Sequence, residues 1–227
     1  MPNLRNFEFN SKYPMDNVCF VYEGTIVGTI YGGAGGYSAT INHNLGFKPL
    51  GLCYYSVDNG TTWNDLDISF YTNIGWGMLT SYTDRFEIDM NISENAPASI
   101  KVRIFAFTPS NQNPVVLPPT PLSRFFLNTN FGYDSLIAKG VVTIPANTSN
   151  FLVYQHNLGY IPKVLMWEEL GDELSRINDG FENASWTGET SSISPYISTT
   201  SLTFTNYSSL SSSPFTLHYR IYGGQNA

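Results

Sequence analysis

A seven-residue phrase occurs twice in this chain, and it constrains the fold more than any other feature of the sequence. HNLGFKP at residues 43–49 returns as HNLGYIP at residues 156–162. Asn and Gly tolerate the left-handed backbone that a tight reversal needs, so each Asn-Leu-Gly is predicted to form a turn. Pro cannot donate a hydrogen bond to a sheet, so it fits at the start of the next strand. The residues of this structural turn motif are His43, Asn44, Leu45, Gly46, Phe47 and Pro49, and His156, Asn157, Leu158, Gly159, Tyr160 and Pro162.

The histidine that opens each copy of the motif has a structural and a functional interpretation. In the structural one, His43 and His156 close the preceding strand and hydrogen-bond the turn backbone. In the functional one, each imidazole is a metal ligand or a catalytic base. A metal site needs three or four ligands at a local spacing, and no second His or Cys lies close in the sequence. A nucleophilic triad needs a Ser or Cys partner that we cannot name. The structural interpretation is favoured, with the aromatic residue after Gly folded over the end of its domain.

Matches between the two halves of the chain extend beyond the motif. Residues 9–18 align with residues 127–136, and toward the end of each half Arg103 aligns with Arg220. The spacing between matched residues changes along the chain, which places the insertions in loops. Internal repeats of this kind indicate duplicated structural units. Each repeat spans about 100 residues, a size that can bury a core of its own.

A proline-rich segment separates the two repeats. Residues 108–123 contain five prolines, which favour an extended, semi-rigid spacer over a folded element. The predicted organisation is an N-terminal domain at 1–107, a linker at 108–121 and a C-terminal domain at 122–227. The spacer is expected to hold the two domains at a defined separation.

Apolar residues alternate with polar ones in both repeats, as in DRFEIDMNI at residues 84–92. This period of two is typical of half-buried strands. Asn59-Gly60 suits a type I′ hairpin turn, and Gly171 marks a turn at the same place in the second repeat. Charged residues make up only 13% of the chain, which favours strands over amphipathic helices. The sequence therefore predicts an all-β protein with two tandem, homologous antiparallel β-sandwich domains, Ig-like or jelly-roll-like.

The charge of the chain argues against several classes of partner. With a net charge of −7 and eleven scattered Lys and Arg residues, no nucleic-acid partner is expected. No signal peptide is recognisable, and no apolar run approaches the ~20 residues that span a bilayer, so we expect synthesis in a cytoplasm and no membrane partner. Cys19 and Cys53 align with Ile137 and Met166, which predicts small buried hydrophobes rather than a disulfide or metal ligands.

No set of residues in the sequence points to catalysis. The acidic stretches lack the spacing of a calcium loop, and the glycine-rich segment 31–37 lacks the Lys and the helix of a phosphate-binding loop. A nucleophile, a base and an orienting group cannot be named together. We therefore expect no enzymatic activity, no catalytic or metal-binding residues and no cofactor. Trp63, Trp76 and Trp186 fall in loops rich in Gly, Asn and Thr, where an indole can anchor a protein partner or stack on a sugar.

Together these features resemble a recurring type of bacteriophage virion protein. The likeness rests on FNSKYPMDNVCFVYEGTIVGTI (residues 9–30) followed by His-x-Leu-Gly-aromatic-x-Pro within small all-β domains, and it covers both repeats. The resemblance implies a non-enzymatic part of the particle, in the tail, neck, fibre or capsid decoration, assembled in the host bacterial cytoplasm. Its partners would be other virion proteins and further copies of itself in a homo-oligomer. The resemblance transfers no catalytic residue.

A competing interpretation comes from a different class of protein. A carbohydrate-binding module could recognise a host-surface glycan through Trp76 and Trp186, because exposed indoles stack on sugar rings. A hydrolase is the weakest of the three interpretations, since no catalytic group can be nominated for it.

Overall fold

The computed structural model describes residues 18–66, 74–112, 135–177, 191–208 and 213–223. These residues form several antiparallel sheets, so the all-β prediction is confirmed. Within them, no helix has the length and apolar character needed to cross a bilayer. The predicted linker lies outside the described residues from residue 113 onward.

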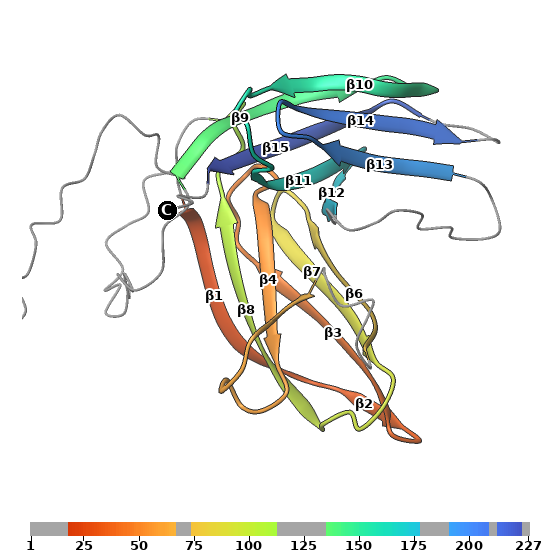
Figure 1. Cartoon of the computed structure of the whole chain (residues 1–227). Helices are drawn as coiled ribbons and strands as arrows, with labels where there is room; N and C mark the ends of the chain where they lie inside the picture. The colour runs from red at the N-terminus through yellow and green to blue at the C-terminus, as the bar shows by residue number, and fades with distance from the viewer. Residues whose placement is uncertain (1–17, 67–73, 113–134, 178–190, 209–212, 224–227) are drawn as a thin grey trace, which may run out of the picture.

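Eight strands of the first half of the chain are arranged in two layers (Figure 1). They are β1 (Val18–Val27), β2 (Thr29–Tyr31), β3 (Ala34–Asn42), β4 (Leu50–Ser56), β5 (Asn64–Asp65), β6 (Ile74–Ser81), β7 (Arg85–Ile92) and β8 (Ser99–Phe107). One layer has the order β1-β8-β4-β5, and the other contains β2-β3-β7-β6. Every second residue of β7 is buried, because successive side chains of a strand point to opposite faces.

The second half contributes seven strands, also in two layers. They are β9 (Ser135–Ile144), β10 (Thr148–Gln155), β11 (Lys163–Leu170), β12 (Glu173–Ile177), β13 (Ser191–Ile197), β14 (Ser201–Ser208) and β15 (Phe215–Gly223). One layer has the order β10-β14-β13, and the other contains β12-β11-β15-β9. The order β9-β15-β11-β12 matches β1-β8-β4-β5 strand by strand, and β10-β14-β13 matches β3-β7-β6.

The ladder partners correct one part of the sequence alignment. Tyr54 lies opposite Arg103, whereas Trp167, at the same distance after the repeated turn, lies opposite His218. Arg103 therefore corresponds to His218, and its alignment with Arg220 is wrong by two residues. A shift of two residues keeps every side chain on the same face of a strand, so the alternation of apolar residues could not reveal it.

The two halves join edge to edge. β6 pairs with β12, with Ser81 opposite Leu174 and Thr80 opposite Ser175, and the two layers become one eight-stranded sheet. The second half lies across one end of the first, with its strands running crosswise to β1, β8 and β4 (Figure 1). The sequence led us to expect a spacer between separated domains, whereas the described parts of the two halves are in direct contact.

Buried apolar side chains form three clusters. The first lies within the first half and includes Phe86, and the second lies within the second half and includes Phe204. The third lies between the halves and consists of Leu50, Leu52, Leu165, Trp167 and Leu174, with Tyr54, Phe107 and Tyr222 packed against it. Because full burial of a large apolar side chain contributes about 1.5–3 kcal/mol, the third cluster makes the junction a major part of the stability of the molecule.

The two cysteines and the hairpin turn between β4 and β5 agree with the predictions made from the sequence. Cys19 and Cys53 form no disulfide and are fully buried, which confirms their prediction as buried small hydrophobes. Burial raises the pKa of the Cys19 thiol to about 11, so it stays protonated. Asn59 and Gly60 have φ angles of 62° and 91°, the positive values that their turn was predicted to need.

Candidate functional site at the junction of the two halves

Both copies of the repeated turn have the same backbone geometry. Asn44 and Gly46 have φ angles of 54° and 77°, and Asn157 and Gly159 have φ angles of 51° and 77°. These values lie in the left-handed region, which Gly and Asn adopt most easily. Among the described residues beyond the chain neighbours, no atom lies within 4 Å of the place that a Cβ would take at either Gly. Backbone conformation, and not crowding, therefore accounts for glycine at these positions.

Three backbone hydrogen bonds tie each turn to the neighbouring hairpin. In the first half, the amides of His43 and Asn44 donate to the carbonyl oxygen of Asp84, and that of Gly46 donates to Thr83. In the second half, the amides of His156 and Asn157 donate to Thr200, and that of Gly159 donates to Thr199. All six donor–acceptor distances lie between 2.8 and 3.0 Å. The repeated phrase thus builds the same clasp in both halves.

The imidazole of each repeated phrase accepts a hydrogen bond from the backbone of its own turn. Nδ1 of His43 accepts a hydrogen bond from the amide of Leu45 at 3.1 Å, and Nδ1 of His156 accepts one from Leu158 at 3.3 Å. The ring of His43 packs against Phe86, with 4.8 Å between the ring centroids. Burial lowers the pKa of His43, although nearby hydrogen bonds and charge oppose this shift, so the ring is neutral at pH 7. Among the described residues, no group of three or more His, Cys, Asp or Glu is placed to hold a metal ion.

The other motif residues close the end of each half. Leu45 and Phe47 are half-buried against the core of the first half. Pro49 is buried immediately before β4, and Pro162 is buried immediately before β11. Tyr160 is half-buried, like Phe47 at the same place in the first copy.

The residue before the proline distinguishes the two copies of the turn. In the first copy it is Lys48, whose Nζ lies 2.7 Å from Oε1 of Glu169 and donates to the carbonyl oxygen of Gly171 at 2.6 Å. In the second copy it is Ile161, which is 66% exposed. The first copy of the turn is therefore part of the junction, and it places a cation there.

Lys48 lines an open pocket of about 200 Å³ at the junction. The wall comes from the first repeated turn, the β6–β7 turn, the segment after β8, and strands β11 and β15. Glu169 binds Lys48 through Oε1, and its Oε2 lies 2.8 Å from Nε2 of His218. One carboxylate thus links an ammonium group of the first half to an imidazole of the second.

The protonation states of this cluster follow from burial and from its neighbours. Burial raises the pKa of Glu169, but its contacts with Lys48 and His218 outweigh burial and leave the pKa below its usual range. Burial lowers the pKa of His218, and the positive charges of Arg220 and Lys48 lower it further. Together these effects outweigh the contact with Glu169, which raises the pKa. At neutral pH a neutral imidazole therefore donates from Nε2 to an ionised carboxylate.

A histidine paired with a carboxylate is also the orienting part of a catalytic triad. In this cluster Nε2 of His218 is engaged with Glu169, and Nδ1 is buried with no hydrogen-bond partner among the described residues. His218 is only 2% exposed, and its Nε2 is held by Glu169. The arrangement suits a clamp between the halves better than acid–base chemistry.

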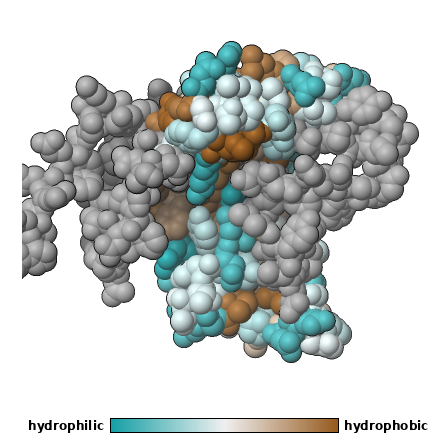
Figure 2. Space-filling model, in the orientation of Figure 1, coloured by the Kyte–Doolittle hydropathy of each residue, from teal (hydrophilic) through white to brown (hydrophobic). Residues whose placement is uncertain are grey.

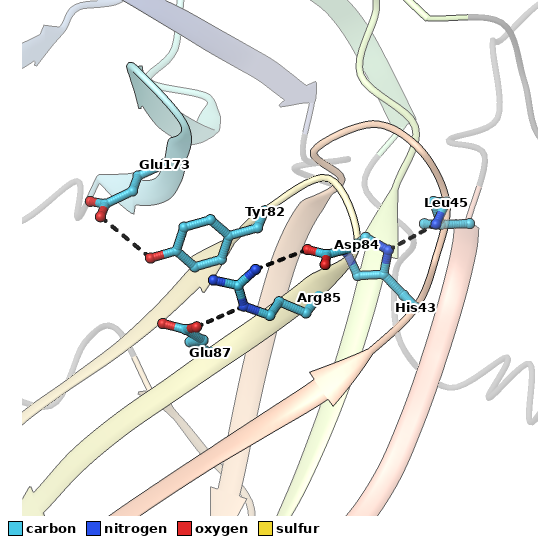
Figure 3. A network of polar contacts seen from close by, with 7 residues as sticks. All are labelled: His43, Leu45, Tyr82, Asp84, Arg85, Glu87 and Glu173. Carbon is cyan, nitrogen blue, oxygen red and sulfur yellow. Dashed lines mark hydrogen bonds and ion pairs between the residues drawn. The ribbon is translucent and has the colours of Figure 1, made fainter.

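Further polar contacts cross the junction. Nη1 of Arg176 donates to both oxygens of Asp65, at 2.9 and 2.7 Å, and both side chains are largely buried. The hydroxyl of Tyr82 donates to Oε1 of Glu173 at 3.3 Å, and the guanidinium of Arg85 stacks on the Tyr82 ring at 4.2 Å (Figure 3). The β6–β7 turn therefore holds both the repeated turn and the second half.

The centre of the junction is aromatic. Nε1 of Trp167 donates to the carbonyl oxygen of Gly51 at 2.9 Å. The guanidinium of Arg220 lies 5.5 Å from the Trp167 ring and 5.2 Å from the Phe107 ring, and it donates to the carbonyl oxygen of Thr108 at 3.0 Å. Trp167 was not among the tryptophans singled out from the sequence. The unbroken apolar run Val164–Trp167 could have revealed it, because such runs are typical of strands covered on both faces.

Of the three tryptophans singled out from the sequence, Trp63 and Trp76 lie within the described residues. Trp63 is half-buried, with the guanidinium of Arg103 4.2 Å from its ring. Trp76 is 40% exposed and lies within strand β6, so its placement in a loop was wrong. Trp186 lies outside the described residues.

Comparisons of the chain with protein-family models, with curated proteins and with solved structures found no match.

Proposed function

We propose that this chain is a non-enzymatic structural component of a bacteriophage particle, in its tail, neck, fibre or capsid decoration, and acts through protein–protein assembly. The junction is the observation that carries this proposal. A continuous sheet and a buried apolar cluster hold the two halves at one angle to each other (Figure 1). Such a body presents two sets of surfaces in a fixed relation, which suits a component that links neighbours in an assembly.

We infer further that the halves are tandem, homologous β-sandwich domains that arose by duplication. The matching strand orders and the repeated clasp of backbone hydrogen bonds support this inference. Duplication followed by divergence keeps the framework and changes the surface, as at Lys48 and Ile161. The copy in the first half then forms the junction, and the copy in the second half can contact a neighbouring protein.

Hydrophobic surface supports an assembly role. Figure 2 shows hydrophobic residues on the second half, at the top of the view, and again where that half overhangs the first. Among the described residues of the second half, the exposed large apolar or aromatic ones are Leu152, Ile161, Leu170 and Tyr196. Exposed apolar groups that gather on one part of a surface are typical of interaction sites.

Glycan binding is the second candidate, and Trp76 favours it. Its indole is exposed on β6, Asn91 lies opposite it on β7, and the exposed Met78 lies two residues further along the same strand. An exposed ring beside an amide can stack on a sugar and hydrogen-bond its hydroxyls. A glycan array tests this candidate: binding that disappears in Trp76→Ala and persists in Met78→Ala would favour it.

Mass spectrometry of purified particles of the phage that encodes this chain tests the assembly proposal. We expect the chain in the particles at a fixed copy number, cross-linked to other virion proteins through its exposed residues. Its absence from intact particles, with the chain recovered only in the soluble fraction of the lysed host, would refute the proposal.

A further inference from the structure

The junction uses one end of the first half, and the corresponding end of the second half carries exposed residues in its described part, at the second repeated turn and on β13. In the first half this end comprises the repeated turn, the start of β4 and strand β6, which pairs with β12. Strand β13 corresponds to β6, and it is the end strand of the sheet β10-β14-β13. Within the described residues, the outer edge of β13 therefore has no paired strand.

We propose that this end of the second half, marked by Ile161 and Tyr196 beside β13, docks onto the first half of a second copy of the chain. The docking repeats between copies the contact that the junction makes within one copy. This inference rests on the duplication proposed above, and it names the partner of one surface.

Tyr196 occupies the position that Thr80 has in the first half. Thr80 lies opposite Glu87 and Tyr196 lies opposite Thr203. Glu87 and Thr203 occupy matching positions in the two halves. Each lies three residues after the residue whose carbonyl oxygen accepts two hydrogen bonds from the repeated turn. Thr80 is 5% exposed beside its partner strand β12, whereas Tyr196 is 67% exposed. A junction position is thus occupied by an open aromatic ring.

Ile161 occupies the position of Lys48, which in the first half binds the other half through Glu169 and Gly171. Ile161 is one of the most exposed large apolar residues in the described chain. Two junction positions of the second half thus carry an isoleucine and a tyrosine. Large apolar and aromatic residues at the centre of an interface supply most of its binding energy, with tyrosine among the strongest.

The first half offers a surface related to the one that the junction covers. In the junction, the end of the first half packs on the outer face of β11 and β12. Strands β4 and β5 correspond to these strands, and β5 is the end strand of its sheet. The ladders match the covered residues Leu165, Trp167 and Leu174 with Leu52, Tyr54 and Trp63.

Part of this face is already used within the chain, because Leu52 is buried in the junction. Tyr54 also packs against the junction cluster. The remainder is half-buried and aromatic: Phe105 meets Tyr54 edge to face at 6.2 Å between ring centroids, and Trp63 lies under Arg103. Glu23, paired with Arg103, is half-exposed on the same sheet. Lys163 is exposed two residues after Ile161, so the docking end brings a positive charge toward an acceptor face that carries a carboxylate.

A contact between different surfaces of two identical chains is heterologous, so it repeats from copy to copy. The angle between successive copies decides whether they close into a ring or continue as a helical fibre. We therefore expect association in solution that does not stop at a dimer unless a ring closes.

Analytical ultracentrifugation of the full chain over a range of concentrations tests the inference. We expect the mean mass to rise with concentration, and the double variant Ile161→Ser/Tyr196→Ser to associate roughly tenfold more weakly or worse. Tyr31→Ser is the matched control, because Tyr31 is 81% exposed on β2, away from the proposed contact. Thermal melting must show that all variants are folded. A chain that stays monomeric throughout, or equal weakening by Tyr31→Ser, overturns the inference.

A mixing experiment tests which surfaces meet. Glu23→Lys and Trp63→Ser alter the acceptor face and leave the docking end intact, and the double variant of the docking end has an intact acceptor face. We expect each of these variants alone to associate roughly tenfold more weakly or worse, and a mixture of a docking-end variant with an acceptor variant to form a one-to-one complex at the original strength. Self-association of both acceptor variants at the original strength shows that the acceptor face is wrong. Because particle composition is measured separately, a monomeric chain that is present in particles overturns this inference and leaves the proposed function standing.

Discussion

At the scale of single residues, the difference between Lys48 and Ile161 in the repeated phrase distinguishes the roles of the two halves. The clasp of backbone hydrogen bonds is the same in both copies, so the turn serves the fold and tolerates change at the residue before proline. Lys48 uses that freedom to reach Glu169, and Ile161 leaves an apolar side chain in solvent. The phrase thus combines fixed backbone geometry with one variable contact position.

The left-handed glycines give a test of the backbone argument. We expect Gly46→Ala and Gly159→Ala each to lower the free energy of unfolding by about 1–2 kcal/mol, because an L-residue is strained at a φ of 77°. Gly36→Ala is the matched control, because a Cβ there also meets no atom within 4 Å and the φ angle is not positive. Urea denaturation measures all three. A loss at Gly36 as large as at Gly46 would contradict the explanation.

The cluster of Lys48, Glu169 and His218 makes stability depend on pH. Burial lowers the pKa of His218 from 6.5, and the contacts of Glu169 lower its pKa from 4.5 despite its burial. A group with a lower pKa in the folded protein binds protons more readily when unfolded, so its contribution to stability is lost as pH falls. The contribution of His218 begins to fall near pH 6.5 and that of Glu169 near pH 4.5.

We therefore expect the free energy of unfolding to decrease between about pH 7.5 and about pH 5.5. His218→Gln keeps a donor for Glu169 and removes the titrating ring, so its decrease should be shallower. His43 also has a pKa lowered by burial, so part of the decrease persists in the variant. Urea denaturation at several pH values measures the slope, and identical slopes for both proteins would show that His218 does not contribute.

At the scale of strands, the junction depends on two short edges. β6 and β12 share only a short ladder, and the ion pair of Arg176 with Asp65 lies beside it. Asp65 and Arg176 occupy matching positions, opposite Tyr54 and Trp167. Opposite charges at matching positions of the two halves thus meet across the contact.

Removing the charge of Asp65 should weaken the junction strongly. We expect Asp65→Asn to cost about 3 kcal/mol, because it removes the charge of one partner of a largely buried ion pair. Glu23→Gln is the matched control at the half-exposed pair with Arg103, and it should cost less than about 1 kcal/mol. Thermal and urea denaturation compare the two, and equal losses would contradict the role of burial.

Much of each strand could be predicted from the sequence, and the contact between the halves could not. The alternation at β7 and the turn residues Asn44, Gly46 and Gly60 are local signals, so the class of fold and the turns follow from them. The pairing of Thr80 and Ser81 with β12 depends on two edges far apart in the chain, and neither residue differs from a solvent-facing one in sequence. The two-residue error in the alignment of Arg220 could not be detected for a related reason, because a shift of two residues leaves the alternation of apolar and polar residues unchanged.

At the scale of the whole molecule, the shared sheet and the third apolar cluster make the two halves one body. Without this contact the two halves could unfold independently, as domains joined only by a linker do. The stability of each half therefore depends on the contact with the other.

We expect a single unfolding transition, with the same midpoint by tryptophan fluorescence and by calorimetry. Trp167→Ala should cost about 3–5 kcal/mol and split the transition, because it empties the centre of the junction. Leu79→Ala is the control within the core of the first half, and it should lower the midpoint without splitting it. Two transitions in the unaltered chain would show that the halves are energetically independent.

The joined edges of β6 and β12 also bear on how the protein can be divided. A fragment carrying only one half would leave a bare strand edge in water, together with leucines that the intact chain keeps covered. Unprotected edges recruit other strands, so such fragments should precipitate or form fibrils when expressed alone. Proteolytic nicking between the halves is better tolerated than their physical separation, because the nicked pieces still shield one another.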